Sequence, residues 1–248
     1  MNHSKNSLTI EEFIRTGFDL KKHLANYLEI SIQNVEDLLP TSSADLAAIH
    51  PGSWKPEDAI SFYETGVGTA HLIELAAWHL NSFDYIADTL RLQEMFARGH
   101  VLDFGGGIGT HALAAAANPK VEHVWFVDLN PHNRKFLLDR AHSLGIEQSI
   151  SVHRDLKSTG RIKFDTVVCL DVLEHISNPS EQLIAFQERL SKDSVALFNW
   201  YFFKGFEGEY PFHFDDPLLI DKFFRTLQEN FIEIFHPYLI TTRAYKLK

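Results

Sequence analysis

A glycine cluster between a short apolar segment and an alanine-rich segment most strongly limits the folds open to this chain. Residues 101–104 read Val-Leu-Asp-Phe, glycines follow at positions 105, 106, 107 and 109, and residues 112–117 are alanines and one leucine. Glycine permits a sharp turn and a close approach of backbone to a ligand, and the first N–H groups of a helix lack partners within it. The pattern therefore predicts a strand–turn–helix ligand site at the carboxyl edge of a sheet.

Beyond residue 96, short apolar runs alternate with helical stretches. Strands are expected at residues 101–104, 124–127, 151–152, 166–170 and 195–198. This alternation predicts a Rossmann-like, doubly wound α/β domain over residues 96–248 with a mostly parallel sheet. A helix is expected over about residues 218–229, followed by strand-like runs at 232–238 and 240–247. These runs are too close for a helical crossover, so they should pair antiparallel at the end of the sheet.

Residues 1–95 read as a helical region that caps the α/β domain. Thr9 and Glu12 resemble a capping box, and a break between two helices is expected near Asn81. Residues 40–54 have a loop-like composition, and residues 56–58 suit the start of a helix. The paired glycines within residues 63–69 indicate a hinge, and we expect this segment, with Tyr63, to close over a bound cofactor.

Two carboxylates accompany the glycine turn. Asp128 ends the next apolar run, where doubly wound folds bind the hydroxyls of a ribose. Asp103 stands two residues before the first glycine, and Thr110 occupies the third glycine position of a dinucleotide fingerprint. A buried acid at position 103 suits a ligand with a positive ammonium better than a pyrophosphate.

The segment Asp-Phe-Gly-Gly-Gly-Ile-Gly at residues 103–109 resembles the first motif of class I S-adenosylmethionine-dependent methyltransferases. The resemblance extends over residues 96–248 and implies S-adenosylmethionine as the cofactor. It places the methionine portion at Asp103 and the glycine backbone, the ribose at Asp128, and the adenine at Leu129 and Asp155. Together with Tyr63 of the expected closing segment, the cofactor-binding residues expected are Asp103, Gly105, Gly107, Gly109, Asp128, Leu129, Asp155 and Asp171.

A second motif, Asp-Val-Leu-Glu-His at residues 171–175, resembles the fourth-strand signature of the small-molecule members of this family. The Asn/Asp-Pro-Pro-aromatic motif typical of base N-methylation is absent from the sequence. Cys169 lies within an expected strand, which indicates a buried apolar side chain rather than a nucleophile. The preferred function is therefore methylation of an oxygen or nitrogen of a small, partly apolar molecule. The alternatives are a peptide or carrier-bound acceptor, or a regulatory protein that binds the cofactor without turnover.

The segment that follows the fifth expected strand is rich in aromatic residues. Its expected substrate-binding residues are Trp200, Tyr201, Phe203 and Tyr210. His175 and His213 each follow a strand at the ligand edge and are the candidate catalytic residues, with a helix expected to begin near Val172. We expect no metal, because Asp215 and Asp216 beside His213 precede Pro217 and suit the start of a helix.

Composition limits the partners. The formal net charge of −10 disfavours a nucleic-acid substrate, since affinity for a polyanion depends on Lys and Arg contacts. The single cysteine fits a reducing compartment. Neither a secretory signal nor a membrane-spanning apolar run is apparent, so we expect a cytoplasmic protein without membrane contact. The sequence leaves a homodimer open.

Overall fold

The structure is a computed structural model that describes residues 8–49, 55 and 57–248. These residues form a seven-stranded sheet with the order β3-β2-β1-β4-β5-β7-β6. The strands are β1 (Gly99–Phe104), β2 (Val121–Val127), β3 (Ile150–His153), β4 (Phe164–Cys169), β5 (Leu190–Phe198), β6 (Phe231–Phe235) and β7 (Arg243–Leu247). Strand β7 pairs antiparallel with both β5 and β6, and the pairings among β1 to β5 are parallel. The predicted fold class is confirmed, including the antiparallel pair, although β7 inserts between β5 and β6.

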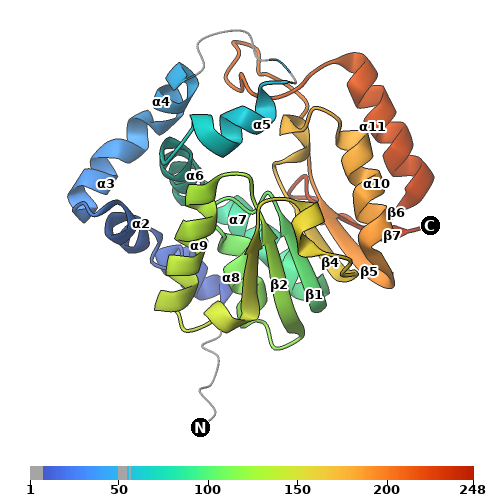
Figure 1. The fold of residues 1–248 in the computed structure, drawn as a ribbon, viewed down its shortest axis with the longest axis horizontal. Coiled ribbons are helices and arrows are strands. Elements are labelled where there is room, and N and C mark those ends of the chain that lie inside the picture. Colours follow the sequence, from blue (N-terminus) through green and yellow to red (C-terminus); the bar gives the residue numbers. More distant parts are fainter. Residues whose placement is uncertain (1–7, 50–54, 56) are drawn as a thin grey trace.

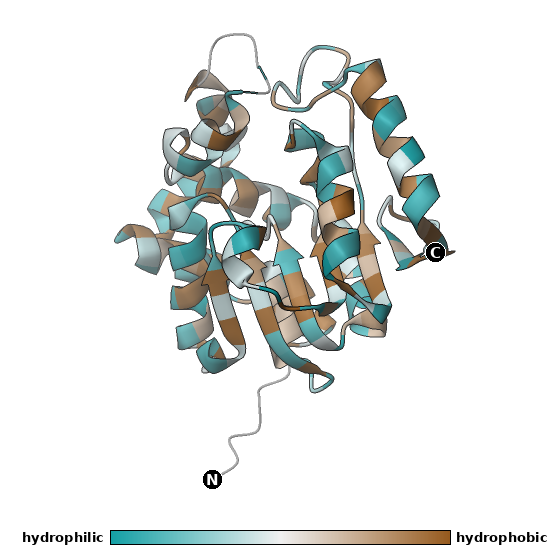
Figure 2. Ribbon diagram, turned by 45° about the vertical axis from the view of Figure 1, so that its right-hand side comes forward, coloured by the Kyte–Doolittle hydropathy of each residue, from teal (hydrophilic) through white to brown (hydrophobic). Residues whose placement is uncertain are grey.

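Helices cover both faces of the sheet (Figure 1). Alternate strand residues face opposite sides, so Val101 packs with α7 (Phe83–Phe96), α8 (Thr110–Ala117) and α9 (Pro131–Ser143). Its neighbour Leu102 packs in the second core with α10 (Pro179–Arg189) and α11 (Pro217–Asn230). Figure 2 shows the apolar strands between helices that are apolar on one side and polar on the other.

Residues 8–96 are mostly helical where they are described. The elements are α1 (Ile10–Thr16), α2 (Leu20–Leu28), α3 (Ile32–Leu38), the 3-10 turn η1 (Leu39–Thr41), α4 (Ser42–Ile49), α5 (Ala59–Ser61), the π-helix η2 (Phe62–Gly66) and α6 (Ala70–Asn81). Thr9 caps α1 through the backbone N–H of Glu12, and α6 ends at Asn81, both as predicted. Ile108 and Phe136 of the α/β domain join the core of α2, α3 and α6.

One expectation for this region is wrong. Residues 42–49, assigned to a loop from composition, form α4. Leu46 supplies the physical reason, because it is buried in a cluster with Phe62, Val67 and Phe212, and this burial stabilises the helix despite its loop-like composition. Residues 50–54 and Pro56 of the expected loop and helix start lie outside the described residues. No helix among the described ranges is long and apolar enough to cross a membrane.

Candidate functional site

The glycine turn joins β1 to α8 at the carboxyl edge of the sheet. Gly105, Gly107 and Gly109 have φ angles of 69°, 55° and 78°, a left-handed conformation that favours glycine. A Cβ at Gly105 would overlap the side chain of Val172, and a Cβ at Gly107 would lie 2.9 Å from Leu75 Cδ1. The turn therefore accommodates only glycine at these positions, and it lies at the edge where the sequence predicts a ligand site.

Asp128 is connected to this turn. The backbone N–H of Gly107 donates to Asp128 Oδ2 over 2.9 Å, and Asn133 Nδ2 donates to Asp128 Oδ1 over 3.1 Å. Burial raises the pKa of Asp128 to about 6, although these hydrogen bonds oppose the increase. Leu129 follows it and is half-buried, with its carbonyl accepting a hydrogen bond from Arg134. The structure thus brings Asp128, Leu129 and the glycine turn together.

Asp103 is buried beneath the turn. Its Oδ2 has no hydrogen-bond partner among the described residues. Burial, with a smaller contribution from Asp128, raises the pKa of the carboxyl group to about 7. A cationic ammonium would satisfy this oxygen, which lies beside the backbone of Gly106 in the turn. These residues fit the cofactor that the sequence resemblance implies.

Asp171 follows β4 at the same edge and has a φ of 54°. Asn199 Nδ2 donates to Asp171 Oδ1 over 2.9 Å and also contacts the Tyr85 hydroxyl. Burial raises the pKa of Asp171 to about 6, and its contact with Asn199 opposes the increase. Asn199 and Tyr85 were not among the sequence candidates. The position of Asn199 directly after the fifth expected strand is a signal that could have identified it.

The segment over residues 62–68 lies against the ends of three strands. The Tyr63 hydroxyl is 2.9 Å from His175 Nδ1, beyond β4, and Asn130 Nδ2, beyond β2, donates to the Gly68 carbonyl over 2.9 Å. Glu64 forms an ion pair with Arg154, which follows β3. The π-helical segment is therefore tied across the carboxyl edge of the sheet.

His175 and His213 lie together. Their ring centroids are 4.6 Å apart and the rings are nearly perpendicular. Burial, with a smaller effect of His213, lowers the pKa of His175 to about 3, and burial lowers the pKa of His213. Both imidazoles are therefore neutral near pH 7. The rings of Tyr201 and Tyr210 pack on His213, with centroid distances of 5.9 and 5.0 Å.

The expected helix start near Val172 is wrong. A 3-10 turn, η5 (Leu173–His175), occupies this position, and α10 begins only at Pro179. The reason is local: Asp171 has a left-handed backbone, and the Asn178 side chain caps the helix at Pro179. The neutral state of His175 thus follows from burial and not from the N-terminus of a helix.

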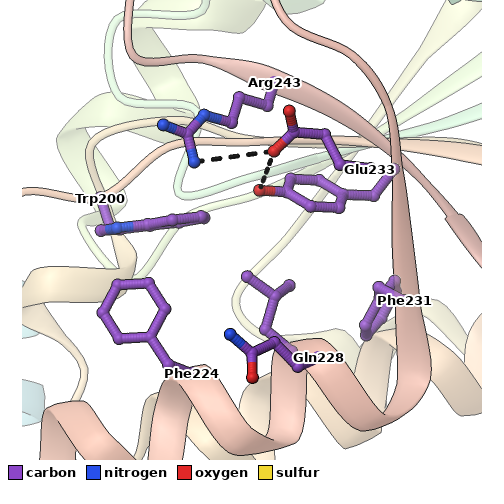
Figure 3. Close-up of a pocket in the computed structure, with 8 residues that line it drawn as sticks. Trp200, Phe224, Gln228, Phe231, Glu233 and Arg243 are labelled. Carbon is purple, nitrogen blue, oxygen red and sulfur yellow. Dashed lines mark hydrogen bonds and ion pairs between the residues drawn. The ribbon is translucent and has the colours of Figure 1, made fainter.

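Three other sequence candidates have surroundings of their own. Asp155 caps the 3-10 turn η4 (Leu156–Thr159) by accepting from the Ser158 backbone, and it is ion-paired with Arg154. Phe203 is partly exposed and packs on Tyr201. Trp200 lines a different pocket, of about 230 Å³, between α11 and strands β6 and β7 (Figure 3). Figure 3 shows its ring above Phe224, with the ion pair of Arg243 and Glu233 nearby.

Several polar residues of the site were missed by the sequence analysis. Glu174 is 1% exposed, and its Oε2 has no hydrogen-bond partner among the described residues. Burial also raises the pKa of Glu74 to about 7 and lowers that of His71 to about 4. His71 and Glu74 are three residues apart on α6 and so share a helix face. That spacing was an available signal for a polar face turned inward.

Comparisons with known proteins give one family and several solved structures of similar fold. A model of methyltransferase domains matches residues 78–202. No curated protein matches the chain. A candidate rRNA methylase from Clostridium thermocellum has a similar fold, with a TM-score of 0.51, 12% identity, and coverage of 66% of this chain and 95% of the other.

Two further solved structures are more distant in shape. An S-adenosylmethionine-dependent methyltransferase from Clostridium acetobutylicum has a TM-score of 0.45 and 15% identity, covering 66% of this chain and 89% of the other. The YcgJ protein from Bacillus subtilis has a TM-score of 0.40 and 22% identity, covering 46% of this chain and 49% of the other. The alignment with YcgJ thus spans about half of that protein.

Proposed function

The chain belongs to the family of methyltransferase domains and uses S-adenosylmethionine as its methyl donor; from this premise we propose that it methylates an oxygen or nitrogen atom of a small, partly apolar molecule. The observation that carries the proposal is the aromatic surface leading to the histidines. Tyr201 and Tyr210 are 44% and 46% exposed and pack on His213, which contacts His175 at the carboxyl edge. Such a surface suits a flat acceptor with one polar group directed inward.

On the donor side, each residue has a distinct proposed role. The Asp128 carboxylate accepts hydrogen bonds from the ribose hydroxyls, and Asp103 balances the ammonium of the methionine portion. The backbone of Gly105 and Gly107 permits the close approach of this portion. When bound, the cofactor supplies a methyl group on a positively charged sulfur.

On the acceptor side, the chain must align the nucleophile and exclude water. The segment containing Tyr63 lies over the edge and limits access of solvent to His175. Because His175 and His213 are neutral near pH 7, each keeps a ring nitrogen with a free lone pair. We propose that these two histidines control the proton of the acceptor group.

A substrate screen tests the proposal. The full chain would be incubated with S-adenosylmethionine and matched sets of small phenols, alcohols and amines, peptides, and RNA, with S-adenosylhomocysteine as the readout. We expect turnover with a small acceptor and only background with peptides and RNA. Turnover confined to peptides would favour the carrier-bound or peptide alternative. Cofactor binding without turnover on any acceptor would contradict the proposal.

The aromatic surface can be tested separately once an acceptor is found. Tyr201→Ala and Tyr210→Ala should raise KM by about 10-fold each, because a lost aromatic contact is worth about 1.5 kcal/mol. Tyr238→Ala is the matched control, since Tyr238 is 90% exposed in the turn between β6 and β7. An equal change in all three variants would show that the surface does not bind the acceptor.

A further inference from the structure

Glu174, His175 and His213 converge at the acceptor side of the edge. Glu174 and His175 belong to the turn after β4, and His213 comes from the long segment after β5. One ligand atom from each residue lies within 4.8 Å of the ligand atoms of the other two. Bonds of about 2.0–2.2 Å to a divalent ion place tetrahedral ligands about 3.4 Å apart, so small side-chain movements would complete a site.

The hydrogen bonds of the two histidines favour metal ligation. His175 Nδ1 lies 3.2 Å from the Phe212 carbonyl, and His213 Nδ1 lies 3.1 Å from the Phe203 carbonyl. A carbonyl can only accept, so the Nδ1–H tautomer of each histidine donates to it and leaves the lone pair of Nε2 for a ligand. The Tyr63 oxygen can share the proton of His175. Metal-binding histidines are commonly oriented in this way by a backbone carbonyl.

Glu174 is a second and independent indication. Its side chain is buried, and its Oε2 has no partner among the residues described here. A buried polar oxygen without a hydrogen-bond partner is costly, and a coordinated cation would supply the missing partner. The neighbouring acid, Asp171, already accepts a hydrogen bond from Asn199.

We propose that Glu174, His175 and His213 bind one divalent transition-metal ion, to which the hydroxyl of the acceptor coordinates. Two imidazoles and one carboxylate suit zinc or iron(II) better than magnesium or calcium. This inference replaces the expectation of no metal, which considered His213 only with Asp215 and Asp216. Asp216 instead caps α11 through the N–H of Leu218, as predicted.

The inference rests on the proposed function and narrows it to an oxygen acceptor. Three protein ligands leave a coordination position open for the acceptor. Coordination lowers the pKa of a hydroxyl, so the O–H proton leaves to solvent water and its bonding pair remains on the oxygen. This oxygen forms the new O–CH3 bond while the C–S bond breaks and its electron pair stays on sulfur. The two histidines therefore act on the acceptor proton through the ion.

Cobalt(II) binding tests the site without any acceptor or methyl donor. The full chain would be treated with a chelator, dialysed and titrated with Co²⁺, with visible absorption and metal content as readouts. We expect one equivalent per chain with the spectrum of a low-coordinate site. Glu174→Gln and His213→Ala should each weaken binding by more than the roughly 10–100-fold typical of a lost outer-shell partner. His142→Ala is the control, because the His142 side chain is 81% exposed on α9.

Melting curves keep the test valid if a variant folds poorly. Glu174→Gln keeps the size and shape of the side chain, so the metal-free variant should melt close to the parent, while Zn²⁺ should raise the Tm of the parent and not of the variant. No bound Co²⁺, or equal binding by all variants, would overturn the inference. Methyl transfer by a protein that binds no metal would overturn only the proposed metal site and would leave the proposed function intact. Absence of turnover despite bound metal would count against the proposed function.

Discussion

The donor half and the acceptor half of the site are built differently. The donor half is a backbone structure, in which the glycine turn is hydrogen-bonded to Asp128 and the surrounding side chains leave no space for a Cβ at its glycines. The acceptor half is made of side chains from three distant segments, represented by Tyr63, His175 and His213. A backbone site tolerates little substitution at its glycines, whereas a side-chain site can change its ligand by single substitutions. The difference suits an enzyme with a fixed donor and a variable acceptor.

Gly107→Val should have the largest effect on the donor half. Valine at a φ of 55° strains the backbone by about 1–3 kcal/mol, and its side chain would meet Leu75. We expect loss of detectable cofactor binding together with a lower Tm. Gly145→Val is the matched control, since Gly145 has a φ of 69° with no atom within 4 Å of an added Cβ. Calorimetry that finds normal binding in folded Gly107→Val would show that the turn does not hold the cofactor.

Asp128→Ala should weaken cofactor binding by about 1–3 kcal/mol, as for hydrogen bonds lost from a charged group. Titration calorimetry with S-adenosylhomocysteine measures the change. Asp155→Ala serves as the comparison, because its carboxylate already caps η4. An unchanged Kd for Asp128→Ala would contradict the ribose role. A large loss for Asp155→Ala would support the adenine contact that the resemblance implies.

Asp103→Asn should have opposite effects on stability and on cofactor affinity. Burial raises the pKa of Asp103 from its ordinary value of 3.8 to about 7, so the folded state retains a proton that the unfolded state releases. The carboxyl group therefore lowers stability progressively as pH rises from about 4 to 7, with the full cost above pH 7. At pH 8 the asparagine variant should melt higher than the parent and bind the cofactor more weakly. A lower Tm of the variant at pH 8 would show that the folded parent already stabilises the Asp103 carboxylate without the cofactor.

The smallest expected effect concerns the segment over residues 63–69. We predict that bound S-adenosylhomocysteine slows hydrogen exchange there, because the segment already contacts Asn130 and Arg154 at the strand ends. Exchange mass spectrometry with and without the ligand measures this protection, with residues 218–229 of α11 as the internal control. Identical exchange of residues 63–69 in both states would argue against a lid.

The sequence predicted the strand–turn–helix arrangement of the proposed donor half because its signals are local. The glycines and Asp103 lie within one short motif, and each strand of the parallel sheet appears as an apolar run. The acceptor half depends on distant contacts, and so the pairing of His175 with His213 and the burial of Glu174 could not be derived from spacing alone. Trp200 shows the same limit. It directly follows Asn199 in sequence, yet it lines the pocket beside α11.

The central claim is that His175 and His213 face the acceptor while the glycine turn and Asp128 hold the donor. Single-turnover methyl transfer by His175→Ala and His213→Ala, with cofactor affinity measured in parallel, tests it most directly. We predict that each variant loses about 10²–10⁴-fold in rate, as for a lost group that controls a transferring proton, and retains the parental Kd for S-adenosylmethionine. Near-parental rates in both folded variants would contradict the claim and favour an acceptor that needs only alignment.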